Sequence, residues 1–450
     1  MKGNGASMAD INGRKYCKLI VYGCQGNVSD GERMAGQLKA IGYERTEEME
    51  QADLILINTC CVRETAEDKV YGKIGEIKAL KRKKPELIFG IAGCMAQKEG
   101  EALIKRAPHI DFVLGTSKVH SLSQTVRRIE AERQHVVDVN LTETELPDES
   151  EAPVLRDGKL SAWVPIMYGC NNFCTYCIVP YVRGRERSRL PEDIVKEVEQ
   201  AARAGYKEVT LLGQNVNSYG KDHKQADFAE LLAMVDKVDG IERVRFMTSH
   251  PKDLSDKVIE AMAQGRHLCE HIHLPVQHGS SKILKAMNRV YTAEAYKDLV
   301  KRIRVALPEV SLTTDLIVGF PGETEEDFEG LLAFLKEIRY DAAYTFIYSK
   351  RSGTPAAEME DQVPEDVKKA RLQRLMEVQN EISLEINQAL LGKTLEVMVE
   401  GPSKNDESVW MGHTRSNKIV LFPHGQEKAG DFVQVKITSP QTWVLKGEVC

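Results

Sequence analysis

The sequence predicts an α/β protein with a small all-β domain at its carboxyl end. From Tyr16 to about residue 390, apolar strand-like runs alternate with amphipathic helical stretches, which is the rhythm of mostly parallel sheets covered by helices. Residues 388–450 instead contain short alternating strands between Gly, Pro and Asn turns. A polar, acidic stretch at residues 141–160 is typical of a linker, so we expect the α/β part to comprise two domains.

The first domain is expected over residues 15–135, after a flexible tail at residues 1–14. Its strand candidates are KLIVYG, ADLILINTC, LIFGIAGC and DFVLG. Helical segments lie between them, one around Asp30 to Ile41 and a longer one that ends at Lys84. This order predicts an open, mostly parallel α/β sheet, followed by a linker at residues 136–158.

Six more strand candidates follow over residues 159–387. They are AWVPIM, EVTLLG, RVRFMTS, HIHLPVQ, LTTDLIVGF and AAYTFIYS, and helical segments separate them. Six such units predict a partial TIM-like (β/α)6 barrel, closed by a long helix from Val367 to Leu390. Over residues 388–450, the runs TLEVMVEGP, SVWMGHTRS, KIVLFP and DFVQVKITS predict a small β-barrel.

Composition limits the classes of function. Ten cysteines in 450 residues, with a polar amino terminus and no secretory signal, indicate a cytoplasmic protein whose thiols bind metal. No apolar run has the length of a membrane span, so no membrane partner is expected. The net charge is -6, from 61 basic and 67 acidic residues, so local patches would have to bind any nucleic acid.

Three cysteines lie close together in the run YGCNNFCTYC. Cys170, Cys174 and Cys177 are too close for disulfides and one ligand short of a structural zinc site. Closed iron-sulfur sites also use four cysteines, so the triad predicts a four-iron cluster with one open iron. The run follows a predicted strand, where α/β folds place active sites. The alternative is a partial zinc site or three unrelated thiols.

A second set of cysteines belongs to the first domain. Cys24, Cys60 and Cys94 each follow a predicted strand, at intervals of 36 and 34 residues. Because the carboxyl ends of parallel strands share one edge of a sheet, we expect these thiols to meet there. Each could instead be an ordinary buried cysteine, and the adjacent Cys61 competes with Cys60. The remaining cysteines are interpreted as free thiols without a role: Cys17, Cys61, Cys269 and Cys450.

On these motifs the chain resembles the radical S-adenosylmethionine (SAM) enzymes. Over nearly the whole chain, except the first dozen residues and the linker, it is similar to the MiaB-type tRNA methylthiotransferases, which have an N-terminal methylthiotransferase domain, a radical-SAM barrel and a C-terminal TRAM domain. The resemblance is carried by YGCQGN, INTCCVRETAEDKV, GCMAQ, CTYCIVPYVRGRERSR, LLGQNVNSYG, TSHP, LPVQHGSSKIL and DLIVGFPGET. The tripeptide NTC in this family's motif favours Cys60 over Cys61 as the second ligand of the N-terminal triad.

The resemblance implies two 4Fe-4S clusters, an auxiliary one on the N-terminal triad and a SAM-binding one on the barrel triad. It also implies two SAM molecules per turnover. One donates a methyl group to a sulfur on the auxiliary cluster, and the other yields a 5′-deoxyadenosyl radical that removes hydrogen from adenine C2. The substrate would be isopentenyl-adenosine at position 37 of tRNA. Because the cofactors supply the reactive species, no residue is assigned as acid or base.

The partners that follow from the resemblance are the tRNA anticodon stem-loop, an electron donor such as flavodoxin or ferredoxin, and a sulfur donor. The enzyme itself is expected to be a monomer. Two other functions stay open. One is a methylthiotransferase that modifies threonylcarbamoyl-adenosine or a ribosomal protein aspartate, and the other is a non-catalytic iron-sulfur protein that binds RNA or senses redox state.

The candidates for SAM binding lie at the carboxyl ends of the barrel strands or on the cluster loop. Polar side chains there can bond the cofactor, and a glycine permits close backbone approach, although an ordinary turn or strand cap is the alternative. Aromatic rings can contact or shape the adenine pocket. The set comprises Tyr176, Gly213, Gln214, Asn215, Gln277, Gly319 and Phe320.

Basic side chains, with one aromatic, are the candidates for tRNA binding. Arg183 and Arg185 follow the cluster loop, and their alternative is pairing with acids such as Glu186. The C-terminal domain is not basic overall, because seven Lys and Arg balance seven Asp and Glu from residue 388 onward. Its candidates are Trp410, Arg415 and Lys418.

Overall fold

The computed structural model describes residues 14–60, 64–141, 153–156, 158, 160–223, 225–404 and 406–450, with the backbone alone at residues 64–68. The chain forms two compact units. The first takes in residues up to Asp157 together with Ile178–Arg185, and the second takes in Gly158–Cys177 and Glu186–Cys450. The domain boundaries expected from the sequence stay a prediction.

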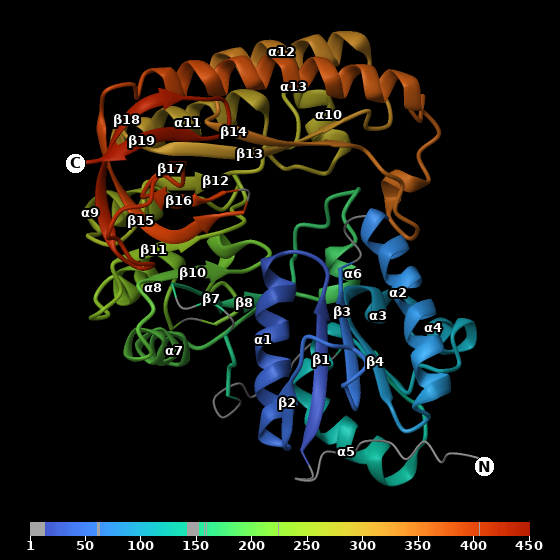
Figure 1. The fold of residues 1–450 in the computed structure, drawn as a ribbon. Helices are drawn as coiled ribbons and strands as arrows, with labels where there is room; N and C mark the ends of the chain where they lie inside the picture. Colours follow the sequence, from blue (N-terminus) through green and yellow to red (C-terminus); the bar gives the residue numbers. More distant parts are fainter. Residues whose placement is uncertain are drawn as a thin grey trace. The chain divides into compact units, whose positions relative to one another are not determined.

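The first unit is built on a six-stranded sheet whose neighbouring strands are all parallel, in the order β2-β1-β3-β4-β5-β6 (Figure 1). This confirms the predicted open parallel sheet. The sequence did not indicate the edge strands β2 and β6. The pairing of β6 with β5 adds residues 136–138, the first of the stretch expected as a linker, to this sheet. The strands are β1 (Lys15–Val21), β2 (Tyr43–Arg45), β3 (Leu54–Thr59), β4 (Ile88–Gly93), β5 (Phe112–Leu114) and β6 (Val136–Asp138).

Helices bury both faces of this sheet. In β3, Ile55 and Ile57 join an apolar cluster with α2 and α4, whereas Leu54 and Leu56 join another with α1 and α5. Burial on both faces explains the continuous apolar run of this strand. The helices are α1 (Gln25–Ala40), α2 (Glu64–Lys83), α3 (Cys94–Glu99), α4 (Glu101–Arg106), α5 (Leu122–Glu132) and α6 (Val179–Arg183), with a 3-10 turn at Thr116–Ser121.

The second unit contains the predicted partial barrel. Its strands pair as two parallel three-stranded sheets, β11-β10-β7 and β12-β13-β14, and a parallel bridge from Val244 to Leu268 extends β11 toward the second sheet. The six strands correspond to the six predicted runs: β7 (Ser161–Pro165), β10 (Glu208–Leu212), β11 (Arg243–Phe246), β12 (His271–His273), β13 (Ser311–Val318) and β14 (Ala342–Ile347). A short antiparallel pair, β8 (Met167–Tyr168) and β9 (Arg187–Ser188), lies beside the cluster loop.

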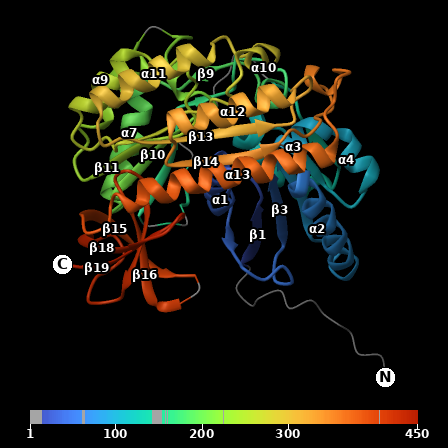
Figure 2. The ribbon, with the colours of Figure 1, turned by 90° about the horizontal axis from the view of Figure 1, so that it is seen from above.

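Helices cover the outside of the barrel strands, and α12 and α13 lie over β13 and β14 (Figures 1 and 2). The helix predicted to close the barrel is α13. None of the helices in the described part of the chain has the length and apolar character needed to cross a membrane. They are α7 (Pro191–Arg203), α8 (Phe228–Val235), α9 (Asp256–Gln264), α10 (Ser281–Ala286), α11 (Ala293–Ala306), α12 (Glu325–Ile338) and α13 (Glu365–Gln388), with 3-10 turns at Val216–Ser218 and Pro355–Ala357.

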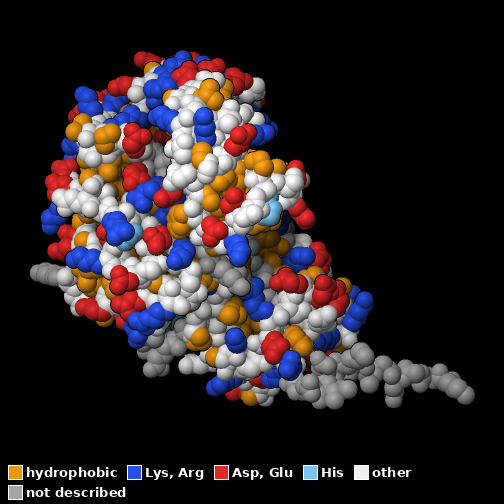
Figure 3. Space-filling view, turned by 60° about the vertical axis from the view of Figure 1, so that its left-hand side comes forward, with side chains coloured by type: hydrophobic (Ala, Val, Ile, Leu, Met, Phe, Trp, Pro, Cys, Tyr) orange, Lys and Arg blue, Asp and Glu red, His pale blue; other side chains and the backbone are white. Residues whose placement is uncertain are grey.

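The C-terminal part is a closed five-stranded barrel in the order β15-β16-β17-β19-β18, as predicted except for the additional β19. Its centre is filled by apolar side chains such as Val397, Val420 and Phe422. On the face shown in Figure 3, Lys and Arg side chains are interspersed with Asp and Glu. The strands are β15 (Thr394–Ser403), β16 (Asp406–Thr414), β17 (Ile419–Pro423), β18 (Phe432–Pro440) and β19 (Leu445–Val449).

Candidate metal centres and cofactor site

The barrel triad lies on the loop that follows β8. Cys170, Cys174 and Cys177 project from a short stretch in which the Cys177 amide donates to the Cys174 carbonyl at 3.0 Å. Two residues of the loop have left-handed backbone conformations, Gly169 with φ 77° and Phe173 with φ 44°. Such a conformation is strained for phenylalanine, and strain of this kind clusters at functional sites.

The end of α10 holds this loop in place. The Asn288 side-chain amide donates to the Phe173 carbonyl at 3.0 Å. The Thr175 amide donates to the Met287 carbonyl at 3.1 Å, and its hydroxyl donates to the Ala286 carbonyl at 2.9 Å. These bonds fix the loop before any cofactor binds, which is the preorganisation that a binding site needs.

A buried cation lies against the triad. Arg289 donates from Nη1 to Cys174 Sγ at 3.5 Å and from Nη2 to the Pro275 carbonyl at 2.6 Å, and its Nε donates to the Tyr291 hydroxyl at 2.8 Å. Burial raises the pKa of the Cys170 thiol to about 11. The buried guanidinium of Arg289 offers a compensating positive charge to an anionic cluster that the triad would hold.

The donor set fits iron and sulfur chemistry. Among the described residues, no three Cys, His, Asp or Glu side chains lie close enough together to bind one metal ion. The three thiols of a four-iron cluster bind three different irons, so they need not lie within bonding distance of one shared ion. Both triads offer thiols alone, and thiolates are the ligands that iron-sulfur clusters prefer.

The N-terminal triad gathers at the carboxyl edge of the first sheet, as its spacing predicts. Cys24 caps α1 after β1, Cys60 follows β3, and Cys94 begins α3 after β4, and these three strands are neighbours. A hydrogen bond with Cys60 lowers the pKa of the Cys24 thiol to about 5. Gly23 permits this approach, because a Cβ there would lie 2.6 Å from Cys60 Cβ. Cys61 lies outside the described residues.

Arg183 is the buried counter-charge of this triad. Its Nη2 lies 2.9 Å from Asp30 Oδ2, and both side chains are less than a tenth exposed. Burial alone would lower the pKa of the guanidinium, but the charges of Cys94, Asp30 and Cys24 raise it. The burial of Arg183 and its ion pair with Asp30 argue against it as a tRNA contact and favour the alternative of pairing within the chain, with Asp30 as a partner that the sequence did not indicate. Arg185 is exposed.

Polar atoms without partners mark the carboxyl end of β10. Asn215 is buried, and its Nδ2 donates to Asp253 Oδ2 at 2.7 Å. The Asn215 Oδ1 and Gln214 Oε1 atoms are buried and find no hydrogen-bond partner among the described residues. At Gly213, a Cβ would lie 2.7 Å from Met167 Cγ. Buried acceptors without donors are costly, so they fit a site whose ligand supplies the donors.

Strained backbone marks the ends of β11 and β12. Thr248 and Gln277 have φ of 69° and 73°, which non-glycine residues adopt at an energetic cost. The Gln277 amide donates to the Asp315 carbonyl at 2.9 Å, and the Ile317 amide donates to the Gln277 carbonyl at 2.9 Å. These bonds to β13 hold the strained residue, which stays a candidate for SAM binding.

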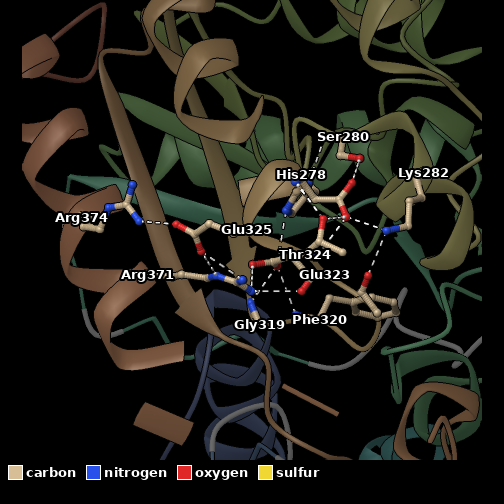
Figure 4. A network of polar contacts seen from close by, with 12 residues as sticks. His278, Ser280, Lys282, Gly319, Phe320, Glu323, Thr324, Glu325, Arg371 and Arg374 are labelled. Carbon is tan, nitrogen blue, oxygen red and sulfur yellow. Dashed lines mark hydrogen bonds and ion pairs between the residues drawn. The ribbon is translucent and has the colours of Figure 1, made fainter. Parts of the chain in front are cut away.

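The turn after β13 is organised by Glu323, a residue that the sequence did not single out (Figure 4). Its buried carboxylate accepts the amides of Gly319 at 2.8 Å and Phe320 at 3.3 Å through Oε2. Oε1 lies 2.9 Å from Arg371 Nη1, and His278 Nε2 lies 3.4 Å from Oε2. The carboxylate thus fixes the backbone of the turn expected to border the adenine.

Phe320 and Tyr176 belong to one apolar cluster, which also contains Tyr348 and Met287. Phe320 is fully buried and stands edge-on to the Tyr348 ring, with the ring centroids 5.4 Å apart. Its ring can therefore support residues that line the predicted adenine pocket, but it is not exposed to contact the adenine itself. Tyr176 is half-buried and stays a candidate for direct contact.

Family models match the chain in three segments. Residues 16–115 match the uncharacterized protein family UPF0004, residues 164–335 match the radical SAM superfamily, and residues 388–450 match the TRAM domain. Curated proteins are similar over almost the whole chain. The tRNA-2-methylthio-N(6)-dimethylallyladenosine synthase of Carboxydothermus hydrogenoformans is 56% identical over 432 residues, which are 95% of this chain and 98% of that protein. A protein of the same name from Clostridium botulinum is 54% identical over 98% of each chain. The chain belongs to this family.

The family expected from the sequence is thus confirmed, and membership of the radical SAM superfamily implies a 4Fe-4S cluster and SAM. Solved structures support the fold. The radical SAM methyltransferase TsrM from Kitasatospora setae superposes with a TM-score of 0.56 at 14% identity, over 76% of this chain and 74% of that one. The radical enzyme OxsB gives 0.56 at 14% identity, over 82% of this chain and 56% of that one.

In the TRAM domain of this family member, the residues predicted to bind tRNA already have partners. Trp410 stacks on His424 with ring centroids 4.2 Å apart. Arg415 pairs with Glu270 at 2.9 Å, and Lys418 Nζ lies 2.6 Å from Asp341 Oδ1. The two cations therefore join the TRAM domain to the barrel, and these ion pairs use the charge that phosphate binding would need.

The sequence did not indicate three charged residues that support the proposed sites: Glu323 at the turn after β13, Arg289 beside the barrel triad and Asp30 near the N-terminal triad. Glu323 lies in a run that the resemblance includes, so its position beside two glycines could have drawn attention to it. Arg289 and Asp30 lie outside the motifs that carry the resemblance. Arg289 is 115 residues from Cys174, and Asp30 is 153 residues from Arg183. Only the fold brings them to the cysteines.

Proposed function

We propose that this enzyme inserts a methylthio group at C2 of N6-dimethylallyladenosine, the isopentenyl-adenosine at position 37 of tRNA. The observation that carries the proposal is the similarity over 95% or more of the chain to tRNA-2-methylthio-N(6)-dimethylallyladenosine synthases. The two separate cysteine triads support it, because the reaction needs both a radical source and a sulfur source.

Two 4Fe-4S clusters would be bound in this scheme. Cys170, Cys174 and Cys177 hold the SAM-binding cluster, and the auxiliary cluster is held by Cys24, Cys60 and Cys94. When bound, the clusters and two SAM molecules supply the methyl group, the sulfur and the 5′-deoxyadenosyl radical.

The residues of the chain bind and orient these groups. Arg289 and Arg183 each place a buried positive charge beside a triad, which stabilises negative charge on sulfur. Gln214 and Asn215 present unpartnered oxygens to the donors of SAM. Tyr176 and Gln277 complete the set, and the turn at Gly319 closes the pocket.

The partners proposed are the tRNA anticodon stem-loop, an electron donor such as flavodoxin or ferredoxin, and a separate sulfur donor. Arg185 is the remaining exposed candidate for phosphate contact next to the cluster loop. We propose a monomer that works in the cytoplasm, because ten cysteines in a chain of 450 residues suit metal-binding thiols in a reducing compartment.

Anaerobic reconstitution tests the assignment of both triads. The wild type should hold about eight irons per chain, and incubation with SAM and reductant should yield 5′-deoxyadenosine. Cys60→Ala should lose about half the iron and still cleave SAM. Cys174→Ala should also lose about half but form no 5′-deoxyadenosine. Four irons in the wild type, or full iron in Cys60→Ala, would overturn the auxiliary site.

A further inference from the structure

Strand β14 carries two exposed aromatic rings. Tyr344 is 55% exposed and Phe346 is 41% exposed, although large apolar side chains in a barrel strand are normally covered. The alternate residues Ala343 and Ile347 pack against the core of the barrel on the side of α13. Because side chains alternate along a strand, the two exposed rings share the opposite, inner face.

This inner face continues onto neighbouring strands. Asp315 of β13 is the register partner of Tyr344, and Ile317 is the partner of Phe346. The His273 ring of β12 stands edge-on to Tyr344 at 5.7 Å. The surface is therefore polar at the end formed by Tyr344, Asp315 and His273, and apolar at the other end, where Phe346 and Ile317 are paired in register. β14 is the edge strand of its three-stranded sheet, and both rings stay partly exposed to solvent.

The surface leads toward the cluster loop. One step past β14, Tyr348 is buried against Phe320, and both share an apolar cluster with Tyr176. Tyr176 stands between Cys174 and Cys177 in the sequence. A group that contacts the two exposed rings would therefore lie next to the residues that pack against the cluster loop.

We propose that Tyr344 and Phe346 bind the target nucleoside and select for its dimethylallyl group. RNA is recognised through unstacked bases that stack on aromatic side chains, and such stacking tolerates any base. The branched five-carbon group matches the apolar end at Phe346 and Ile317, where burying it removes apolar surface from water. This inference rests on the proposed tRNA substrate and adds the residues that distinguish dimethylallyl-adenosine from adenosine.

Two anticodon stem-loop RNAs that differ only in the dimethylallyl group provide the test. Their dissociation constants are measured by fluorescence anisotropy with the reconstituted enzyme. Phe346→Leu should weaken binding of the dimethylallyl RNA by about 10-fold and that of the plain RNA by much less, whereas Tyr344→Leu removes a stacking ring and should weaken binding of both RNAs by about 10-fold. Tyr344→Phe keeps the ring and should bind like the wild type. Val305→Ala, at an 82% exposed apolar site on α11, is the matched surface control.

Equal weakening of both RNAs by Phe346→Leu would overturn the selection for the dimethylallyl group, and unchanged binding in both leucine variants would overturn the site. Thermal melting of each variant checks that the fold is kept. If the wild type fails to methylthiolate the dimethylallyl RNA, the proposed function itself is wrong. If it does so while the leucine variants bind normally, only the inference about β14 fails.

Discussion

Replacement of Glu323 by alanine tests how the turn beside the proposed adenine pocket is held. The carboxylate is fully buried and accepts the amides of Gly319 and Phe320. It also pairs with Arg371, which is 7% exposed. Glu323→Ala leaves two buried donors without an acceptor and leaves Arg371 with Glu325 as its remaining carboxylate partner.

The expected loss in the free energy of unfolding follows from the burial of the Glu323 carboxylate. Removal of one partner of a buried ion pair costs about 3–5 kcal/mol. An unsatisfied buried donor costs about 1–3 kcal/mol, and this term overlaps with the first. We therefore expect Glu323→Ala to lower the free energy of unfolding by about 4 kcal/mol. Glu325 contacts the same Arg371 but is 56% exposed, so Glu325→Ala should lose less than about 1 kcal/mol.

Urea unfolding of the two variants measures this difference directly. Because the turn borders the proposed SAM pocket, the dissociation constant for SAM should rise in Glu323→Ala and stay unchanged in Glu325→Ala. Equal losses of stability in the two variants would refute the reasoning, since the argument depends on burial and not on the ion pair alone.

Three further changes probe other parts of the structure. Asp30→Ala removes the carboxylate partner of the buried Arg183 and should lower the free energy of unfolding by about 3–5 kcal/mol. The double variant with Arg183→Met should recover most of this loss, and additive losses in thermal melting would contradict the prediction. Arg243 of the barrel is fully buried, donates to the His413 carbonyl at 2.6 Å and pairs with Glu396, both in the TRAM domain. Arg243→Met should therefore speed proteolysis between the barrel and the TRAM domain. An unchanged rate of proteolysis would argue against Arg243 as a link between the two. Burial lowers the pKa of His271, so the unfolded state binds more protons below about pH 6.5 and stability falls there. His271→Gln should flatten this part of the profile, and an unchanged slope would exclude His271 as its source.

The sequence predicted the barrel well because its six strands are apolar runs separated by helices. It failed at the edges. β2 and β6 have three residues each, too few to show a pattern, and they form because β1 and β5 offer unpaired edges. β19, with the sequence LKGEV, has only two apolar side chains, Leu445 and Val449, separated by Lys446, Gly447 and Glu448, and it gave no strand signal either.

The cysteines could be predicted because their meaning depends on spacing and on the shared edge of parallel strands. Their electrostatic surroundings could not. Arg183 and Asp30 are 153 residues apart, and Arg289 and Cys174 are 115 apart, so no local pattern relates them. The same limit misled the interpretation of Arg415 and Lys418, because a sequence shows a charge but not the carboxylate that neutralises it.

Nucleoside mass spectrometry of tRNA is the most direct test of the proposed reaction. A strain that lacks this protein should accumulate dimethylallyl-adenosine without its methylthio derivative. Complementation with the wild-type chain should restore the derivative, and Cys60→Ala or Cys174→Ala should not. An unchanged nucleoside profile in the deletion strain, or restoration by either cysteine variant, would contradict the account of a two-cluster tRNA methylthiotransferase.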